Sequence, residues 1–166
     1  MAQAHTPPLG SAVLTVVPDS VRLKVLTLLA EGNVTGAVEY YLVATGARHA
    51  PGWLQGLPSA FNATNRIAGR CVDVARKLHE GFTALGKAPR YLRVTSTESE
   101  VLAFEVTAGV PASTVQISNN NYHVAVRVGS RIYDAFTGPK GLTTSEYVGR
   151  MFTPEGRVVL EEVASP

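Results

Sequence analysis

The spacing of apolar residues changes from a helical to an extended pattern near residue 90, and this change limits the fold more than any other feature of the chain. Before it, apolar side chains recur every three or four residues, as they do on one face of a helix. After it, short runs rich in β-branched and aromatic residues are separated by turn residues. Helices followed by hairpin-linked strands predict an α+β fold whose central helix packs on an antiparallel sheet.

Three helices are predicted in the first half of the chain. The first begins at Asp19 or Ser20 and ends at Gly32, and Asn33 caps a second that runs from 34 to 45. The third is the central helix, whose apolar face runs from Ile67 to Leu85. Residues 1 to 17 form a tail or arm, and the Pro- and Gly-rich stretch 48 to 58 is predicted as a loop that Trp53 anchors on the core.

The second half of the chain is predicted to be mostly strands. Gly129-Ser130 occupies the place of a two-residue hairpin turn between two of them, and Thr143 or Thr144 caps a short helix that reaches Met151. The predicted strands are 91–94, 101–106, 114–118, 122–128, 131–136 and 157–163.

Composition excludes several classes of protein. One cysteine among 166 residues rules out an internal disulfide and a multi-cysteine zinc site, and no histidine spacing suggests a metal site or any other cofactor. The net charge of +2 comes from scattered basic residues, so we expect no nucleic-acid partner. We expect neither a membrane span nor a signal peptide, and therefore a cytoplasmic protein or one delivered into a target cell by a secretion system.

The single cysteine, Cys71, is predicted in the first turn of the central helix. Unpaired N–H groups and the positive end of the helix dipole favour a thiolate there, and the thiolate is the nucleophilic form. The alternative is a small buried hydrophobe, because Cys71 is in register with Ala75, Leu78 and Phe82. Four basic residues lie near Cys71 in the sequence: Arg66, Arg70, Arg76 and Lys77. They favour either the thiolate or an acidic partner, or they simply form a solvated helix face.

The hairpin brings a histidine and an aspartate together. If Gly129 and Ser130 form the turn, Asp134 pairs with Ala125 and is a diagonal neighbour of His123 on the same face of the sheet. His123 is then a candidate base and Asp134 its orienting carboxylate, with Nδ1 of His123 donating to Asp134 and Nε2 facing Cys71. The alternative is a surface histidine near a surface aspartate.

Asn65 is a candidate donor to the oxyanion of a tetrahedral intermediate. It lies six residues before Cys71, and its side-chain amide would act together with the backbone N–H of Cys71. Asn62 is a rival for the same role, and either asparagine can instead be a helix cap.

Three stretches of this sequence resemble the papain-fold toxin domains found at the C-termini of bacterial polymorphic toxins. They are Gly69 to Leu78, Gln116 to Gly129, and Ile132 to Asp134 with the following glycines, and the resemblance covers roughly residues 60 to 152. The chain departs from the family pattern at Tyr122 and Ala135. The resemblance implies a papain-like fold with Cys71 as nucleophile, His123 as base and Asp134 as orienter.

Together these observations predict a Cys-His-Asp thiol hydrolase that acts on protein amides, used as an antibacterial toxin or effector, with a protein substrate and a cognate immunity protein as partners. We expect a cysteine protease. Glutamine deamidation and transglutaminase-like acyl transfer share the mechanism up to the second step and stay open, as does a non-catalytic papain-like binding module. We expect an N-terminal arm and two-helix brace over residues 1–59 and the catalytic domain over residues 60–166.

Overall fold

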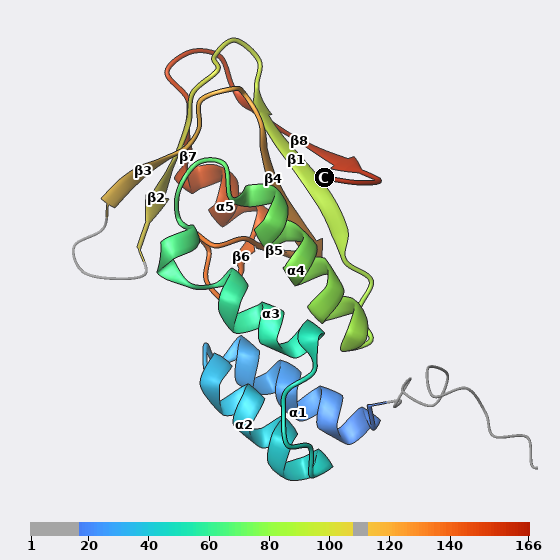
Figure 1. The fold of residues 1–166 in the computed structure, drawn as a ribbon. Coiled ribbons are helices and arrows are strands. Elements are labelled where there is room, and N and C mark those ends of the chain that lie inside the picture. The colour runs from blue at the N-terminus through green and yellow to red at the C-terminus, as the bar shows by residue number, and fades with distance from the viewer. Residues whose placement is uncertain (1–16, 108–112) are drawn as a thin grey trace, which may run out of the picture.

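The structure is a computed structural model that describes residues 17 to 107 and 113 to 166. The chain folds as helices first and strands afterwards, with one late helix (Figure 1). The helices are α1 (Asp19–Ala30), α2 (Val34–Thr45), α3 (Gly52–Ala60), the short 3₁₀ helix η1 (Ala63–Asn65), α4 (Cys71–Ala84) and α5 (Thr144–Arg150). The strands are β1 (Arg90–Ser96), β2 (Leu102–Val106), β3 (Ser113–Ser118), β4 (His123–Val128), β5 (Arg131–Tyr133), β6 (Leu142–Thr143), β7 (Met151–Phe152) and β8 (Val158–Val163).

The strands form two antiparallel sheets. The larger has the order β6-β5-β4-β1-β8, and the smaller has the order β3-β2-β7. In the larger sheet β4 pairs with β1 on one side and with β5 on the other. The strand that carries His123 is therefore held on both edges.

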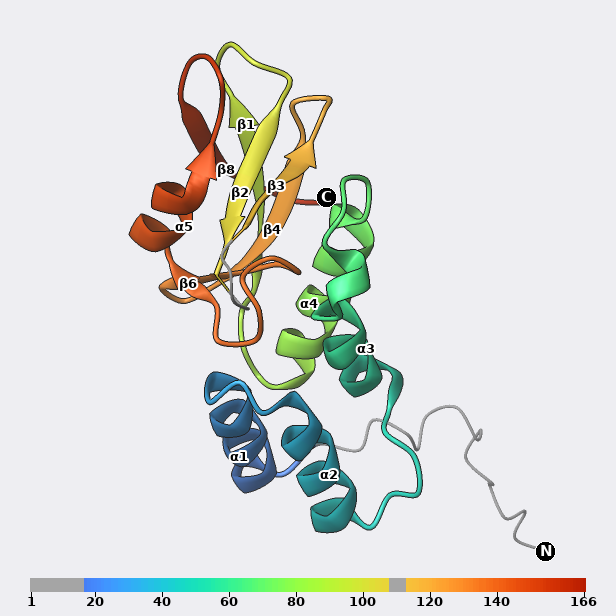
Figure 2. The ribbon, with the colours of Figure 1, turned by 90° about the vertical axis from the view of Figure 1, so that its left-hand side faces the viewer.

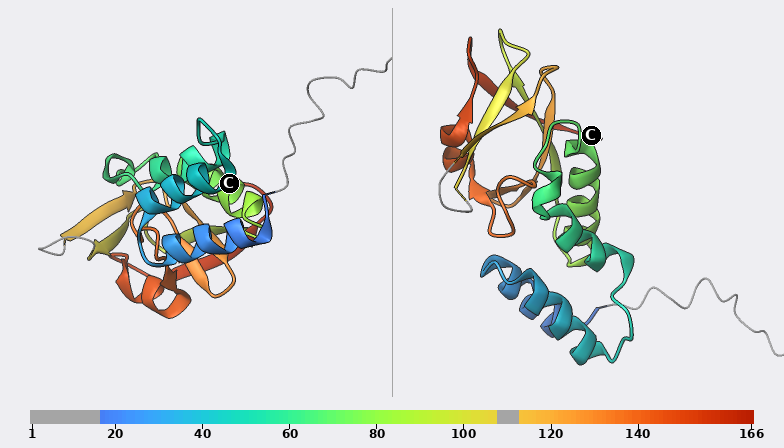
Figure 3. Two further views of the ribbon diagram at one scale, coloured as in Figure 1. Left: turned by 90° about the horizontal axis from the view of Figure 1, so that it is seen from below. Right: turned by 60° about the vertical axis from the view of Figure 1, so that its left-hand side comes forward.

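Two hydrophobic cores lie on opposite faces of the larger sheet. The helix-side core joins α1, α2, α3 and α4 to Val124 and Val126 of β4. The inter-sheet core packs Ala125 and Ile132 against the smaller sheet and α5. Figure 2 and the right-hand view of Figure 3 show α3 and α4 on one side of the strands and α5 on the other. The N-terminal pair α1 and α2 lies below α3 and α4, as the view from below in Figure 3 also shows.

The predicted α+β class is confirmed, and several local signals act as expected. Asn33 caps α2 by accepting a hydrogen bond from the backbone N–H of Gly36, and Gly46 ends that helix with a left-handed φ of 70°. Gly129, at φ 59°, turns β4 into β5, and Val128 pairs with Arg131 as the turn requires. The hairpin register that the site depends on is therefore set by two turn residues.

Three expectations about secondary structure were wrong. Residues 52 to 60 form α3 rather than a loop: Pro51 directly precedes the helix, and burial of Leu54, Leu57 and Ala60 outweighs the helical hydrogen bond that Pro58 removes. Trp53 does pack on the core, but from this helix, with its ring edge-on to Tyr41 at 5.5 Å. Ile67 is outside α4 and 53% exposed.

The third correction concerns the end of the hairpin. β5 ends at Tyr133 rather than at residue 136, since the Asp134 side chain accepts hydrogen bonds from the backbone N–H groups of Phe136 and Thr137 and turns the chain.

As for the predicted domain division, residues 1 to 16 lie outside the described part of the chain, and the helix-side core includes side chains from both sides of residue 59. The division stays a prediction.

Close packing of α3 on α4 depends on Gly81. A β-carbon at this position would lie 2.6 Å from Cδ2 of the buried Leu57 and 3.2 Å from the Trp53 carbonyl oxygen. We expect Gly81→Ala to lower the free energy of unfolding by about 1–3 kcal/mol because of this overpacking, despite the better helix propensity of alanine.

The matched control is Gly149→Ala in α5, where a β-carbon would meet nothing within 4 Å. This variant should be more stable than the wild type by about 0.5–1 kcal/mol. Urea unfolding of the three proteins measures both effects, and equal stabilisation by the two alanines would contradict the packing argument.

Candidate active site

The first residue of α4 is Cys71, and its half-buried side chain packs on the helix-side core. The first intrahelical hydrogen bond of α4 runs from the Val74 N–H to the Arg70 carbonyl. The N–H groups of Cys71, Val72 and Asp73 thus have no carbonyl partner within the helix. The thiol therefore stands at the positive end of a helix of 14 residues.

His123 and Asp134 form a buried pair across the β4–β5 hairpin. The side chains are 1% and 3% exposed, and His123 Nε2 lies 2.9 Å from Asp134 Oδ2. The alternative of a surface histidine near a surface aspartate is thus wrong. The edge of the His123 ring also meets Phe136, with ring centroids 6.0 Å apart, so an aromatic side chain covers the imidazole.

The expected assignment of the two imidazole nitrogens was reversed. Nε2, not Nδ1, contacts the carboxylate, which leaves Nδ1 as the ring atom available to Cys71. Nδ1 is buried and makes no hydrogen bond to a described residue, while the Cys71 thiol lies near enough to raise the pKa of His123. Loose geometry of this kind is common before substrate binds. The ring orientation was unpredictable, because strand register alone does not fix rotation about χ2.

Four donors hold the Asp134 carboxylate. Oδ1 accepts from the backbone N–H groups of Phe136, at 2.8 Å, and Thr137, at 2.9 Å. Oδ2 accepts from His123 and from the hydroxyl of Tyr147, which donates at 2.8 Å from α5 and is completely buried. Sequence reasoning did not assign Tyr147 a role, and the only signal for it was an aromatic residue in the short helix after the hairpin.

The pKa values of His123, Asp134 and Cys71 are all shifted from their ordinary values. Burial alone would lower the pKa of His123, but its hydrogen bond to Asp134, the nearby Cys71 thiol and the negative charges of both groups raise it to about 9. Burial likewise favours neutral Asp134, yet His123, Tyr147 and Thr137 hold the pKa of that carboxyl below its ordinary value. Asp134 is thus ionised and His123 protonated near neutral pH.

Cys71 completes the charged set. Burial raises the pKa of the thiol, but the nearby His123 ring with its positive charge, together with the backbone N–H groups of Val124 and Val72, offsets this and lowers the pKa below its ordinary value. Of the nearby basic residues, Arg66 donates to the Ala135 carbonyl, and Lys77 pairs with Asp73. A thiolate–imidazolium pair is therefore favoured by the imidazole and the helix start.

The segments before Cys71 and before His123 are both fixed by side chains. Arg66 Nε donates to the Ala135 carbonyl at 2.9 Å, which ties the approach to α4 to the turn after Asp134. Asn121, in a left-handed conformation at φ 54°, exchanges two hydrogen bonds with the backbone of Ser96 in β1. Ser118 accepts from the Tyr122 N–H at 3.0 Å. These contacts fix the loop directly before His123.

Asn65 is placed near the approach to α4, but its amide is already engaged. Nδ2 donates to the Ser59 carbonyl at 2.6 Å, so only its second N–H is free for an oxyanion, and that role stays a prediction. Asn62 caps η1 through the Thr64 N–H. His49 lies in the loop after α2, His79 lies on α4, and His5 falls outside the described residues.

Within residues 17 to 107 and 113 to 166, no group of three or more His, Cys, Asp or Glu side chains is placed to hold a metal ion. None of the helices in this part of the chain has the length and apolar character needed to cross a membrane.

Comparisons of this chain with protein-family models, with curated proteins and with solved structures find no match.

The stability that the Tyr147 hydroxyl contributes through Asp134 should be complete at neutral pH and lost at acidic pH. Tyr147→Phe removes one donor from Asp134, so its pKa in the folded state rises toward the unfolded value. A depressed carboxyl pKa contributes stability above the unfolded pKa and loses it as pH falls through the folded one. We therefore expect a loss of about 1–2 kcal/mol at pH 7 and an acid transition that begins at higher pH.

Urea unfolding between pH 3 and 7 measures this, with Tyr133→Phe as the control. Tyr133 is not among the donors to Asp134, and its ring packs on Phe82 in the helix-side core. The same acid profile for the two phenylalanine variants would mean that the Tyr147 hydroxyl does not stabilise the carboxylate.

Proposed function

We propose that this chain is a thiol hydrolase of protein amides, with Cys71 as the nucleophile, His123 as the acid and base, and Asp134 as the carboxylate that orients His123. The observation that carries the proposal is the buried His123–Asp134 pair with its free Nδ1 beside a half-exposed thiol of lowered pKa. Burying a charged pair is costly, and apolar residues of similar size often give equal or better stability. Stability alone is therefore a weak reason for a chain to keep this arrangement, which supports a chemical role for it.

The proposed reaction has two halves. The Cys71 thiolate attacks the amide carbonyl carbon, and the protonated Nδ1 of His123 gives its proton to the leaving nitrogen as the C–N bond breaks. Nδ1, which is now unprotonated, takes a proton from a water molecule while the oxygen of that water attacks the thioester carbon. The C–S bond then breaks and releases a carboxylic acid and the Cys71 thiolate. The N–H groups at the start of α4 are donors for the oxyanion, with the second Asn65 N–H as the candidate partner.

Asp134 supplies the orientation in this scheme. Its contact with Nε2 keeps Nδ1 directed to the sulfur, and its negative charge stabilises the imidazolium that the ion pair requires. Tyr147 acts on the carboxylate alone and is a positioning residue.

Proteolysis of a specific protein is the reaction that we propose, and the resemblance to polymorphic-toxin domains extends it to an antibacterial effector that a cognate immunity protein neutralises. Water and the C–N bond of the backbone are the simplest reactants for this triad. Deamidation of glutamine differs only in the leaving group, and acyl transfer only in the second nucleophile, so the products distinguish the three.

Reactivity of the thiol should depend on pH in two steps. Because the Cys71 pKa is lowered, alkylation by iodoacetamide should reach its plateau at a lower pH than that of free cysteine, and His123→Ala should move the plateau back to higher pH. Turnover should fall as pH rises through about 9, where His123 loses the proton that the leaving group needs. Alkylation of Cys71 at the same rate and pH dependence as free cysteine would contradict the ion pair.

The reaction itself is identified by mass spectrometry of bacterial cell protein treated with wild type or with Cys71→Ala. We expect new peptide termini with the wild type alone, because the variant has no nucleophile while an alanine at a helix start preserves the fold. A gain of one mass unit at glutamine would instead identify a deamidase, and crosslinked peptides an acyltransferase. Identical peptide sets from the two proteins would reject the hydrolase.

A further inference from the structure

A pocket of about 460 Å³ opens beside the loop that follows the Asp134 turn. Residues 137 to 142 line one part of it, Arg150 at the end of α5 and Thr107 after β2 line another, and Gly32 between α1 and α2 lines a third. Figure 2 shows the connection between α1 and α2 facing the loop that leads into β6. Three separate parts of the fold thus enclose a volume in the range of small-molecule sites.

Two cations line this pocket, and neither is neutralised by a carboxylate. The ion pairs among the described residues involve neither Lys140 nor Arg150, and no aspartate or glutamate lines the pocket. Residues 1–16 and 108–112, which lie outside the described part of the chain, contain no aspartate or glutamate, so they supply no carboxylate either. Two positive charges without an internal counterion favour a ligand with two negative charges.

Three carboxylates lie near these cations in the chain or in the fold. Glu146, one turn before Arg150 in α5, accepts a hydrogen bond from the Thr143 N–H in a capping box. Glu105 lines a neighbouring pocket that shares Arg150, and Glu31 directly precedes Gly32, but neither forms an ion pair or lines the pocket of Lys140. These carboxylates weaken the positive field at a distance, and they do not occupy the place of a ligand.

Neutral groups hold both cationic side chains in place. A β-carbon at Gly32 would lie 3.1 Å from Cε of Lys140, so the lysine stem packs directly over this glycine. The Arg150 guanidinium donates to the Thr107 hydroxyl, and Arg131 donates to the Lys140 carbonyl at 3.4 Å. Because these side chains are already ordered, binding a ligand costs less conformational entropy.

The rest of the lining suits an uncharged organic group. Pro139 and Leu142 supply apolar contact, and Gly138 and Gly141 leave space because they have no side chains. An inorganic phosphate ion would fill only a small part of about 460 Å³. The pocket therefore has room for an organic group attached to the anion.

We infer that this pocket binds a small organic phosphate, with Lys140 and Arg150 on the phosphate group and with Pro139 and Leu142 against the organic part. A phosphate monoester carries close to two negative charges at neutral pH, which match the two cations. The planar guanidinium of arginine also fits two phosphate oxygens at once. No residue of the triad lines the pocket, so this inference does not rest on the proposed hydrolase.

The test is calorimetric titration of the wild-type protein, at constant ionic strength, with adenosine monophosphate, glucose 6-phosphate and inorganic phosphate. At least one of the two organic phosphates should bind more tightly than inorganic phosphate, and adenosine without its phosphate should not bind measurably. If neither organic phosphate binds, or if neither binds more tightly than inorganic phosphate, the inference is wrong.

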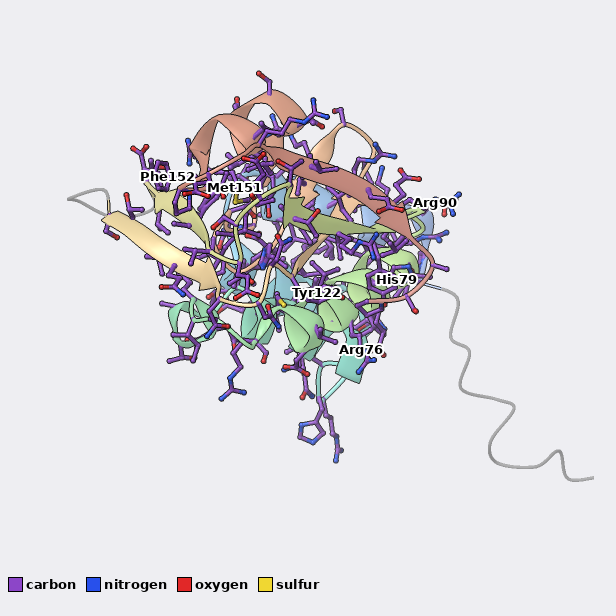
Figure 4. All side chains as sticks on the ribbon, turned by 90° about the horizontal axis from the view of Figure 1, so that it is seen from above. Arg76, His79, Arg90, Tyr122, Met151 and Phe152 are labelled. Carbon is purple, nitrogen blue, oxygen red and sulfur yellow. The ribbon has the colours of Figure 1, made fainter. Side chains whose placement is uncertain are left out.

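Lys140→Gln and Arg150→Gln each remove one charge and keep a side chain of similar length. We expect about threefold weaker binding for the exposed Lys140 and about tenfold for the half-buried Arg150. The matched control is Arg90→Gln. Figure 4 shows exposed Arg90 on the flank of the molecule opposite Met151 and Phe152, which directly follow Arg150. This control should bind as the wild type does, and equal weakening in all three variants would reduce the binding to unspecific attraction of anions.

A second measurement locates the ligand. In proton–nitrogen NMR spectra of the wild type, the amide signals of Gly32, Gly138 and Gly141, which line the pocket, should shift saturably as the organic phosphate is added. Gly69 lies two residues before Cys71 and reports on the start of α4, another place where an anion could bind, and its signal should stay unchanged. Shifts confined to Gly69 and its neighbours would place the anion at the candidate active site and reject the pocket.

Discussion

The hydrogen bond between His123 and Asp134 is the interaction on which the rest of the site depends. Both groups are buried where an isolated charge would be unstable, and each is ionised because the other is. The carboxylate can bear its charge because Phe136, Thr137 and Tyr147 also donate to it. The pair in turn affects Cys71, because the proton that the imidazole retains lowers the pKa of the Cys71 thiol.

Different parts of the fold supply each contribution to this pair. The β4–β5 hairpin sets the separation of the two side chains, α5 brings the tyrosine hydroxyl, and the start of α4 brings the sulfur together with free N–H groups. Arg66 and Asn121 fix the two loops that precede the reacting residues.

Local sequence signals predicted the fold class and most of the site, and they failed where the outcome depends on distant packing. Gly129-Ser130 was enough to predict the hairpin register, and so the pairing of His123 with Asp134. The orientation of the imidazole depends on neighbours from α4 and the inter-sheet core, so the predicted roles of its nitrogens were reversed. Tyr147 could not be assigned because its partner is thirteen residues away in the chain. α3 was missed because proline and glycine counted against a helix that is stabilised by burial of Leu54 and Leu57.

The position of Tyr147 late in the chain has a consequence for synthesis. A ribosome releases Cys71 first, then His123 and Asp134, and only afterwards the helix whose hydroxyl completes the carboxylate's set of donors. Until β4, β5 and α5 have docked, the sulfur has no imidazolium beside it and behaves as an ordinary thiol. The lowered pKa of the Cys71 thiol therefore depends on the finished tertiary structure and is absent from a nascent or truncated polypeptide.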